Sequence, residues 1–295
     1  MTDAAIKRRI PRLTTILSIQ SHVVFGHVGN SAAVFALQRS GCETLALNTV
    51  QFSSHAGYKG FRGERFQASH IDACVAGLQA IDALRSCDGV LSGYLGAAET
   101  GEAVLRAVAA TKAANPLALY CCDPVIGDLG RGAYVSKDVA DVIRTRAVPA
   151  ADVVTPNAFE LETLVGRAAS TLKEARTAVA ALQALGPRVV LVTSLMLDDT
   201  PPDALDLLSA DGRNCWRLRT PNAPISVRGA GDLIAALFFF HLLSTRSAAE
   251  ALKRAASSVY GVVAETLRLG RRELALVAAQ EEIVRPSRVF EPEPV

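Results

Sequence analysis

The stretch that decides the fold is Ser226-Val227-Arg228-Gly229-Ala230-Gly231-Asp232, followed by the apolar run Leu233-Ile234-Ala235-Ala236-Leu237-Phe238-Phe239-Phe240. The apolar run predicts a buried helix, which places Gly229, Ala230 and Gly231 at its N-terminus. Unpaired N–H groups and the helix dipole favour an anion there. Asp232 falls in the first turn, where its carboxylate can accept a proton from an attacking hydroxyl. The stretch therefore suits phosphoryl transfer, although a plain turn followed by a dipole-complementing aspartate has the same sequence.

The composition is that of a chain with a large hydrophobic core. The protein has 295 residues, of which 50% are hydrophobic and 20% charged. Lys and Arg total 31 and Asp and Glu total 29, so the net charge of +2 gives no reason to expect a nucleic-acid or membrane partner. The six cysteines form no CxxC pair, and we expect reduced thiols in a cytoplasmic protein. No apolar run is long enough to span a bilayer.

Short apolar strands alternate with helices along the chain. We expect strands at 14–19, 43–47, 89–92, 117–122, 152–155 and 189–193, a hairpin formed by 205–209 and 215–219, and helices at 32–39, 68–85, 98–114, 136–146, 157–165, 171–185 and 248–269. This alternation predicts an α/β fold with a mostly parallel sheet covered by helices on both faces. We expect one domain at 14–285, preceded by a mobile basic extension at 1–13 and followed by a charged tail at 286–295.

Polar and aromatic residues follow the predicted strands, at the edge where ligands bind in parallel sheets. A long polar and aromatic loop is expected at 48–58, and the glycine-rich segment 127–132 is expected to be mobile. The residues at the strand ends are Ser21, His22, Phe52, His55, Tyr58, Tyr94, Asp123, Asp128, Asn157, Glu160, Thr193 and Ser194. We therefore expect a binding site at this edge.

Asp123, Asn157 and Glu160 carry the oxygen ligands that Mg²⁺ prefers. Two of them also fit a structural role, with Asn157 capping a helix and Glu160 completing a capping box. For these two residues both interpretations stay open, whereas Asp123 favours a functional role.

The histidines and aromatic residues near this edge also allow two interpretations. His22, His27 and His55 match no zinc spacing, and we expect ordinary loop histidines. The neighbouring aromatic residues suit either stacking on a flat aromatic substrate or packing at the rim of the site.

Six blocks of the sequence together resemble the pyridoxal kinases of the ribokinase-like superfamily. They are Gln20-Ser21-His22-Val23, Asn48-Thr49-Val50-Gln51-Phe52-Ser53, Ser92-Gly93-Tyr94, Cys122-Asp123-Pro124-Val125, Thr155-Pro156-Asn157-Ala158-Phe159-Glu160 and Gly229-Ala230-Gly231-Asp232. The resemblance spans residues 14–285. The last block indicates only the superfamily, whereas the first two are specific to the vitamin B6 branch. The resemblance implies a three-layer α/β/α fold with a small β flap.

The resemblance further implies ATP-dependent phosphorylation of the 5′-hydroxyl of pyridoxal, with pyridoxine and pyridoxamine as further candidate substrates. Asp232 would be the base, and the N–H groups of Gly229, Ala230 and Gly231 would stabilise the transferred phosphoryl group. The other implied roles are pyridoxal contacts for Ser21, Phe52, His55 and Tyr94, Mg²⁺ and ATP-phosphate contacts for Asp123, Asp128 and Glu160, nucleotide contacts for Thr155, Thr193 and Ser194, and a flap at 127–134. Family members are usually homodimers, and many use K⁺ as well as Mg²⁺.

Three positions depart from the family pattern. Ala230 and Ala56 replace threonines, and Thr193 stands where some bacterial members have lysine. Ala230 keeps the backbone N–H of the anion site, whereas Ala56 bears on the choice among B6 vitamers. Arg228 beside the glycines either helps to neutralise ATP or is simply solvated.

Two other functions are alternatives. A hydroxymethylpyrimidine kinase of the same superfamily has a similar anion site, but the loop with His55 and Tyr58 argues against it. A non-catalytic binder of B6 vitamers would need no base, so Asp232 and its glycines argue against that function.

Overall fold

The alternation of side chains along the buried strands separates the molecule into layers. The computed structural model describes residues 12–223 and 227–295. In the strand β4 (Gly89–Ser92), Val90 packs into one hydrophobic core and Leu91 into another. Val190 and Leu191 of β9 (Val189–Leu195) divide in the same way. Because successive strand residues point to opposite faces, the sheet has a separate core on each side.

Within the described residues, the large sheet has ten strands in the spatial order β12-β11-β10-β9-β8-β5-β4-β1-β2-β3. The strands from β2 to β9 in this order are parallel, and those at the two ends pair antiparallel. The remaining strands are β1 (Thr15–Phe25), β2 (Glu43–Ser54), β3 (Gly63–Arg65), β5 (Leu119–Cys122), β8 (Val153–Val154), β10 (Ala204–Asp211), β11 (Asn214–Pro221) and β12 (Glu293–Pro294). The predicted mostly parallel sheet and the predicted hairpin are confirmed.

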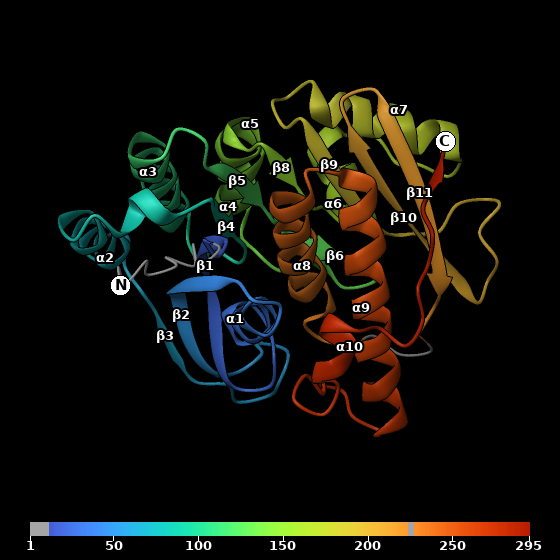
Figure 1. Ribbon diagram of the computed structural model, residues 1–295, viewed down its shortest axis with the longest axis horizontal. Coiled ribbons are helices and arrows are strands. Elements are labelled where there is room, and N and C mark those ends of the chain that lie inside the picture. Colours follow the sequence, from blue (N-terminus) through green and yellow to red (C-terminus); the bar gives the residue numbers. More distant parts are fainter. Residues whose placement is uncertain (1–11, 224–226) are drawn as a thin grey trace, which may run out of the picture.

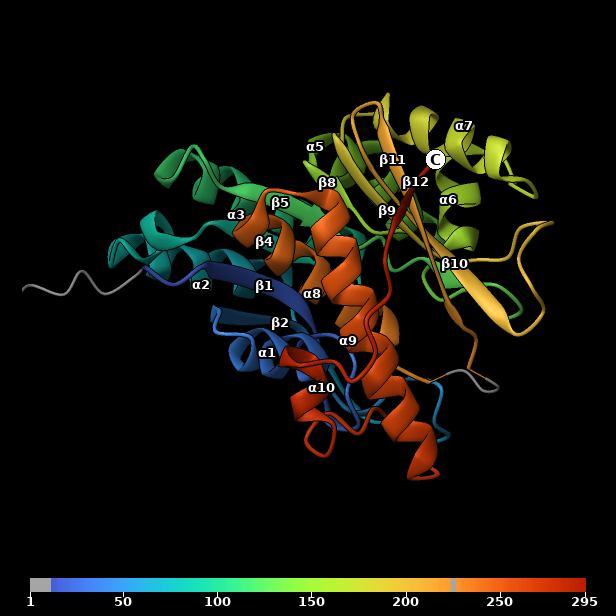
Figure 2. The same cartoon turned by 45° about the vertical axis from the view of Figure 1, so that its right-hand side comes forward.

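Helices cover both faces of this sheet (Figures 1 and 2). One core lies beneath α1 (Asn30–Arg39), α8 (Ala230–Thr245), α9 (Ala248–Arg268) and α10 (Gln280–Val284). The other lies beneath α2 (Ala68–Ala80), α3 (Ala98–Ala114), α4 (Lys137–Val142), α6 (Ala158–Val165) and α7 (Leu172–Gln183). The predicted three-layer arrangement is confirmed. None of the helices in the described residues is long and apolar enough to cross a membrane.

The first two strands are longer than predicted. β1 continues past Ile19 to Phe25, and β2 continues past Leu47 to Ser54, so most of the expected loop at 48–58 is strand. The two strands stay paired after a register shift between Gln20 and His22. The cause is a small apolar cluster of Val23, Val28, Val50 and Phe52, which buries alternate residues of the two extensions. Tertiary packing thus outweighs the polar character of the intervening residues.

Two predicted helices are interrupted. The helix expected at 68–85 ends at Ala80, because Asp82 adopts a left-handed backbone conformation with φ +56° before the 3₁₀ turn η1 (Ala83–Ser86). The helix expected at 136–146 consists of α4 and the π-helical turn η2 (Ile143–Ala147), and α5 (Val148–Ala150) follows directly.

The segments expected to be irregular are partly structured. In the glycine-rich segment, β6 (Gly127–Asp128) pairs with β7 (Gly132–Ala133) to form a small hairpin. In the C-terminal segment, Phe290 is buried and β12 pairs with β11. The predicted extension at 1–13 lies outside the described residues except for its last two positions.

Candidate active site

A cavity of about 1020 Å³ lies beyond the ends of β5 and β8 and beside the start of α8. The fourteen residues to which the resemblance gives a role line it: Ser21, Phe52, His55, Tyr94, Asp123, Asp128, Thr155, Glu160, Thr193, Ser194, Gly229, Ala230, Gly231 and Asp232. His22 and Tyr58, which were also expected at this edge, are not among its lining residues. The fourteen residues come from strands, loops and the first turns of α6 and α8, between positions 21 and 232 of the sequence. The cavity therefore lies where the topology of parallel sheets places ligands.

The turn into α8 has no room for a side chain at its first glycine. Gly229 is the N-cap, with φ +88°, and a Cβ there would lie 1.8 Å from the backbone oxygen of His27. The N–H group of Leu233 bonds to the Gly229 oxygen at 2.9 Å. The N–H groups before Leu233 have no preceding carbonyl within the helix, so they are available to an anion.

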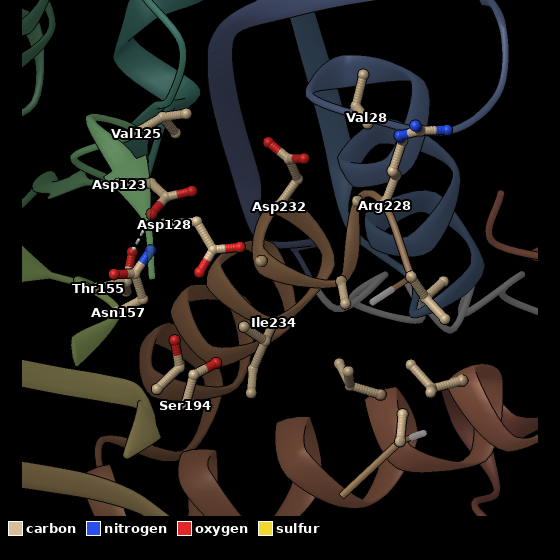
Figure 3. A pocket seen from close by; sticks show the side chains of 18 of the residues that line it. Val28, Asp123, Val125, Asp128, Thr155, Asn157, Ser194, Arg228, Asp232 and Ile234 are labelled. Atoms are coloured by element: carbon tan, nitrogen blue, oxygen red, sulfur yellow. Dashed lines mark hydrogen bonds between the residues drawn. The ribbon is translucent and has the colours of Figure 1, made fainter. Parts of the chain in front are cut away.

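Asp232 lies on the first turn of α8 and faces the cavity (Figure 3). Burial raises the pKa of its carboxyl to about 6, and a backbone hydrogen bond with Gly29 works against the increase. Such a carboxylate is ionised at neutral pH but is more basic than an exposed aspartate. It meets the requirement for a general base that operates near pH 7.

A second group of carboxylates lies across the cavity from this turn. Asp123 is 7% exposed and accepts a hydrogen bond from Thr155 Oγ1 at 3.0 Å. Burial, together with the negative charges of Glu160 and Asp232, raises its pKa well above the ordinary value. Figure 3 shows Asp123, Asp128 and Asp232 around the same space. This concentration of negative charge favours a cation.

The structure tests whether these acids form a complete metal site. Residues 12–223 and 227–295 contain no group of three His, Cys, Asp or Glu side chains arranged to hold a metal ion. Mg²⁺ commonly uses one or two carboxylates and takes its other oxygens from water and substrate phosphates. The acids at this site fit that mode of binding and do not fit a closed protein cage.

Asn157 and Glu160 form the capping box that was one of the two interpretations. Asn157 Oδ1 accepts from the Glu160 N–H, and Glu160 Oε2 accepts from the Asn157 N–H, both at 2.9 Å. Glu160 Oε1 also accepts from the N–H groups of Ile126 and Gly127, and Asn157 Nδ2 donates to the Gly127 oxygen at 2.8 Å. The cap of α6 therefore anchors the β6–β7 hairpin as well. Burial raises the pKa of Glu160 to about 7.

The opposite end of the cavity is formed by the first two strands and the loops near them. Phe52 packs edge-on against Phe61, with ring centroids 5.2 Å apart. His55 Nδ1 accepts from the Gly57 N–H at 2.9 Å, which leaves Nε2 as the protonated nitrogen of the neutral ring. Burial lowers the pKa of His55, and the positive charge of Arg228 lowers it further.

Of the other two histidines expected in loops, His27 lies in a loop and His22 does not. His22 lies within β1 and not in a loop, because β1 continues to Phe25. His27 does lie in the loop before α1, and burial lowers its pKa.

An apolar wall of the cavity was not predicted from the sequence. It comes from the segment after β9, from β10, from the segment before α8 and from α9, and its residues are Met196, Leu205, Leu207, Val227, Ala256, Val259, Tyr260 and Val263. Ser194, at the edge of this wall, has φ +56°, an uncommon conformation for a residue other than glycine. These positions are typical core residues in the sequence, so no local pattern distinguishes them.

The β6–β7 hairpin contributes two further residues that were expected only as part of a flap. Arg131 and Tyr134 line the cavity beside Asp128. Burial, and next the charge of Asp128, raises the pKa of the Tyr134 hydroxyl to about 12. Glu273, which pairs with Arg228 at 3.2 Å, was not singled out in the sequence at all.

Comparison with known proteins assigns the family. Residues 66–276 match the model of the phosphomethylpyrimidine kinase family. The chain is 51% identical over 279 residues to the pyridoxal kinase PdxY of Granulibacter bethesdensis, a match that covers 93% of this chain and 98% of the relative. The chain belongs to the pyridoxal kinases of this family.

Two further comparisons agree with this assignment. The pyridoxal kinase PdxY of Rubrobacter xylanophilus is 52% identical, over 92% of this chain and 94% of the relative. The solved structure of the pyridoxal kinase from Leishmania donovani, in complex with ADP and pyridoxamine, superposes with a TM-score of 0.89 at 29% identity, over 96% of this chain and 99% of that chain. The family therefore shares this fold over nearly the whole chain.

Proposed function

We propose that this protein is an ATP-dependent pyridoxal kinase that phosphorylates the 5′-hydroxyl of pyridoxal to give pyridoxal 5′-phosphate. The observation that carries the proposal is the placement of Asp232. Its carboxylate, with a pKa of about 6, borders the backbone turn at the start of α8 and faces a cavity that also contains Ser21, Phe52 and Tyr94. The relatives named as pyridoxal kinases support the same substrate.

In this mechanism, Asp232 accepts the proton of the 5′-hydroxyl as that oxygen attacks the γ-phosphorus of ATP. The bond from this phosphorus to the β–γ bridging oxygen breaks, and ADP leaves. The N–H groups of Gly229, Ala230 and Gly231 stabilise the negative charge on the transferred group. Such donors act strongly because they are already oriented before the reaction begins. Ala230 supplies the same N–H group as a threonine would.

The two ends of the cavity have different partners. Ser21, Phe52, His55 and Tyr94 contact the pyridine ring of pyridoxal, by stacking and by polar contacts. Thr155, Thr193 and Ser194 line the nucleotide end, where the apolar wall suits the adenine base. The β6–β7 hairpin covers the reacting groups and excludes water, which would otherwise compete with the alcohol.

Asp123, Asp128 and Glu160 are the residues that would hold Mg²⁺. The fit rests on the buried carboxyl of Asp123, whose negative neighbours make a cation favourable there. When bound, Mg²⁺ neutralises the phosphate oxygens during transfer. Glu160 also keeps its role in the capping box. We include K⁺ as a further activator, to be tested by omitting each cation in turn from the assay.

The proposal also covers the domain organisation, the oligomeric state and the location of the protein. Residues 14–285 act as one kinase domain, and the protein works as a homodimer in the cytoplasm. Light scattering on the purified protein tests the dimer. A molar mass of one chain would contradict it.

A coupled assay of ADP release tests the main function. Pyridoxal, pyridoxine, pyridoxamine and hydroxymethylpyrimidine are supplied as separate acceptors with ATP and Mg²⁺. We expect the highest kcat/KM with a B6 vitamer. Preference for the pyrimidine would support the second candidate, a hydroxymethylpyrimidine kinase, which the name of the matching family model favours. Binding of pyridoxal without any ADP release would indicate the non-catalytic binder.

A further inference from the structure

A polar cluster beside the cavity joins three segments that are far apart in the sequence. The Tyr58 hydroxyl donates to Glu273 Oε1 at 2.8 Å, and Arg228 Nη1 donates to the same oxygen at 3.2 Å. The Arg228 guanidinium also lies 4.4 Å from the centroid of the Tyr58 ring. We call these three residues the Glu273 cluster. The side chains of Arg228 and Glu273 are only 17% and 12% exposed, so their charges are weakly screened by solvent.

The cluster is attached directly to the turn that carries Asp232. Arg228 precedes Gly229, and its N–H group bonds to the Arg272 oxygen at 3.4 Å beside an isolated bridge to Glu273. Figure 3 shows Arg228 and Asp232 on the same turn at the start of α8. A movement of Glu273 would therefore also move the backbone N–H groups at the start of α8 that form the anion site.

The cluster also anchors the substrate-side loop, which we define as residues 55–61. His55, Ala56 and Gly57 of this loop line the cavity. The backbone bonds from Tyr58 to His55 and from Phe61 to Tyr58 are local. In the described part of the chain, the hydrogen bond of Tyr58 to Glu273 is the only one from residues 55–60 to a distant segment. Apolar packing also holds the loop, through Phe61 on Phe52 and Tyr58 on Phe25, but its polar link to the turn before α8 runs through the Tyr58 hydroxyl.

We propose that Glu273 is a positioning residue that holds the substrate-side loop against the turn carrying Asp232. Its Oε1 serves both Tyr58 and Arg228, whereas its buried Oε2 has no hydrogen-bond partner. If either Tyr58 or Arg228 moves away, the poorly solvated Glu273 carboxylate keeps only its other partner. The two contacts therefore form and break together. Closure of the loop over the acceptor and placement of the anion site are then one event. The effect on KM rests on the proposed kinase function, whereas the anchoring of the loop by Glu273 does not.

Two conservative variants test the proposal. Tyr58→Phe removes the hydroxyl and keeps the ring under Arg228, whereas Glu273→Gln removes the charge and keeps the shape. The matched control is Glu281→Gln, which breaks the 2.6 Å ion pair with Arg39 on another part of the surface. Loop opening is measured without substrates, by the rate of limited trypsin cleavage after the exposed Lys59 and Arg62. Steady-state kinetics then gives KM for pyridoxal and for ATP separately.

We expect both variants to be cleaved about tenfold faster at Lys59 and to raise KM for pyridoxal about tenfold. A tenfold change corresponds to about 1.4 kcal/mol, which lies at the lower limit of the range for a hydrogen bond to a charged group. KM for ATP should change less than twofold, and the double variant should behave like either single variant. Glu281→Gln should match the wild type in both measurements.

Two results overturn the proposal. One is wild-type cleavage and wild-type KM in Tyr58→Phe, the variant that disturbs folding least. The other is an equal rise of both KM values together with a lower melting temperature, which would indicate a merely structural role. The cleavage assay uses no turnover. If the wild type fails to phosphorylate pyridoxal, the proposed function fails while cleavage still decides whether the loop is held by Glu273.

Discussion

Substitution of Asp232 by asparagine tests the proposed base most directly. Asparagine keeps the shape of the side chain but cannot accept the proton. A missing general base costs about 10²- to 10⁴-fold in rate, and we expect kcat for pyridoxal to fall within that range. The Kd for pyridoxal, measured by titration calorimetry, should change little, because the proposed ring contacts come from β1, β2 and the loops after β2 and β4.

The raised pKa of Asp232 predicts how the wild-type rate depends on pH. With a pKa of about 6, about one carboxyl in eleven is ionised at pH 5 and about ten in eleven at pH 7. The kcat/KM for pyridoxal should therefore rise about tenfold across this interval and level off above it. The residual rate of Asp232→Asn should lack this step. A wild-type profile that is flat between pH 5 and pH 7 would refute the assignment of Asp232 as the base.

The same pKa predicts that Asp232→Asn makes the protein more stable. The folded pKa lies about two units above the ordinary value of 3.8, and each unit corresponds to 1.36 kcal/mol. A raised folded pKa contributes stability below pH 3.8 that is lost as the pH rises through 6. At pH 7.5 the variant should thus be more stable, by at most about 3 kcal/mol for the full shift. The side chain of Asp232 is only partly buried, so solvent reduces this gain. The gain should shrink towards pH 4, and a lower melting temperature at pH 7.5 would contradict the burial argument.

Three further substitutions, two of them with a matched control, test the supporting structure. Burial raises the pKa of Asp206, but hydrogen bonds from Arg219, Arg217 and Thr200 lower it to about 2. The contribution of Asp206 to the free energy of unfolding is therefore present above pH 4 and is lost as the pH falls through 2. Asp206→Asn should lower the unfolding free energy in urea at pH 7 by about 3 kcal/mol. Gly229→Ala should lower kcat/KM at least 100-fold and the melting temperature by several degrees, whereas Gly231→Ala, whose Cβ has no neighbour within 4 Å, should keep the wild-type melting temperature. Asn157→Ala should lower the free energy of unfolding by about 1–2 kcal/mol, because α6 loses its cap, and should raise KM for ATP, because the β6–β7 hairpin loses an anchor. The control Thr171→Ala, in the remote capping box of α7, should leave KM for ATP unchanged.

Local sequence signals predicted the elements whose packing is also local. The predicted bounds of α3 and β4 agree with the structure, because helix periodicity and a short apolar run identify them without reference to distant residues. The ends of β1 and β2 were missed, because Gln20-Ser21-His22 is polar and because polar residues separate Val50 and Phe52 after Leu47. These residues are extended because each strand pairs with the other and shares a small apolar cluster.

The site was predictable where chemistry is visible in single residues. Acidic, polar, aromatic and glycine residues at strand ends, together with the family resemblance, identified fourteen of the residues that line the cavity, because parallel strands bring these ends to one edge. The apolar wall and Glu273 could not be found in this way. Val259 and Val263 resemble any buried face of a helix, and Glu273 gains its significance only from contacts with residues 45 and 215 positions away.

The first β–α turn and the turn into α8 are best understood as one physical unit, although about 200 residues separate them. Gly29 has φ +53°, and a Cβ there would lie 2.3 Å from the Ser21 oxygen. A Cβ at Gly229 would lie closer still to backbone, 1.8 Å from the His27 oxygen, and the Gly29 backbone acts to lower the pKa of Asp232. Because backbone meets backbone without side chains between, Ser21 and Asp232 have little freedom to separate. A substrate held at Ser21 is therefore presented to a base whose position is fixed by the same contact, which is the arrangement that transfer to a bound alcohol requires.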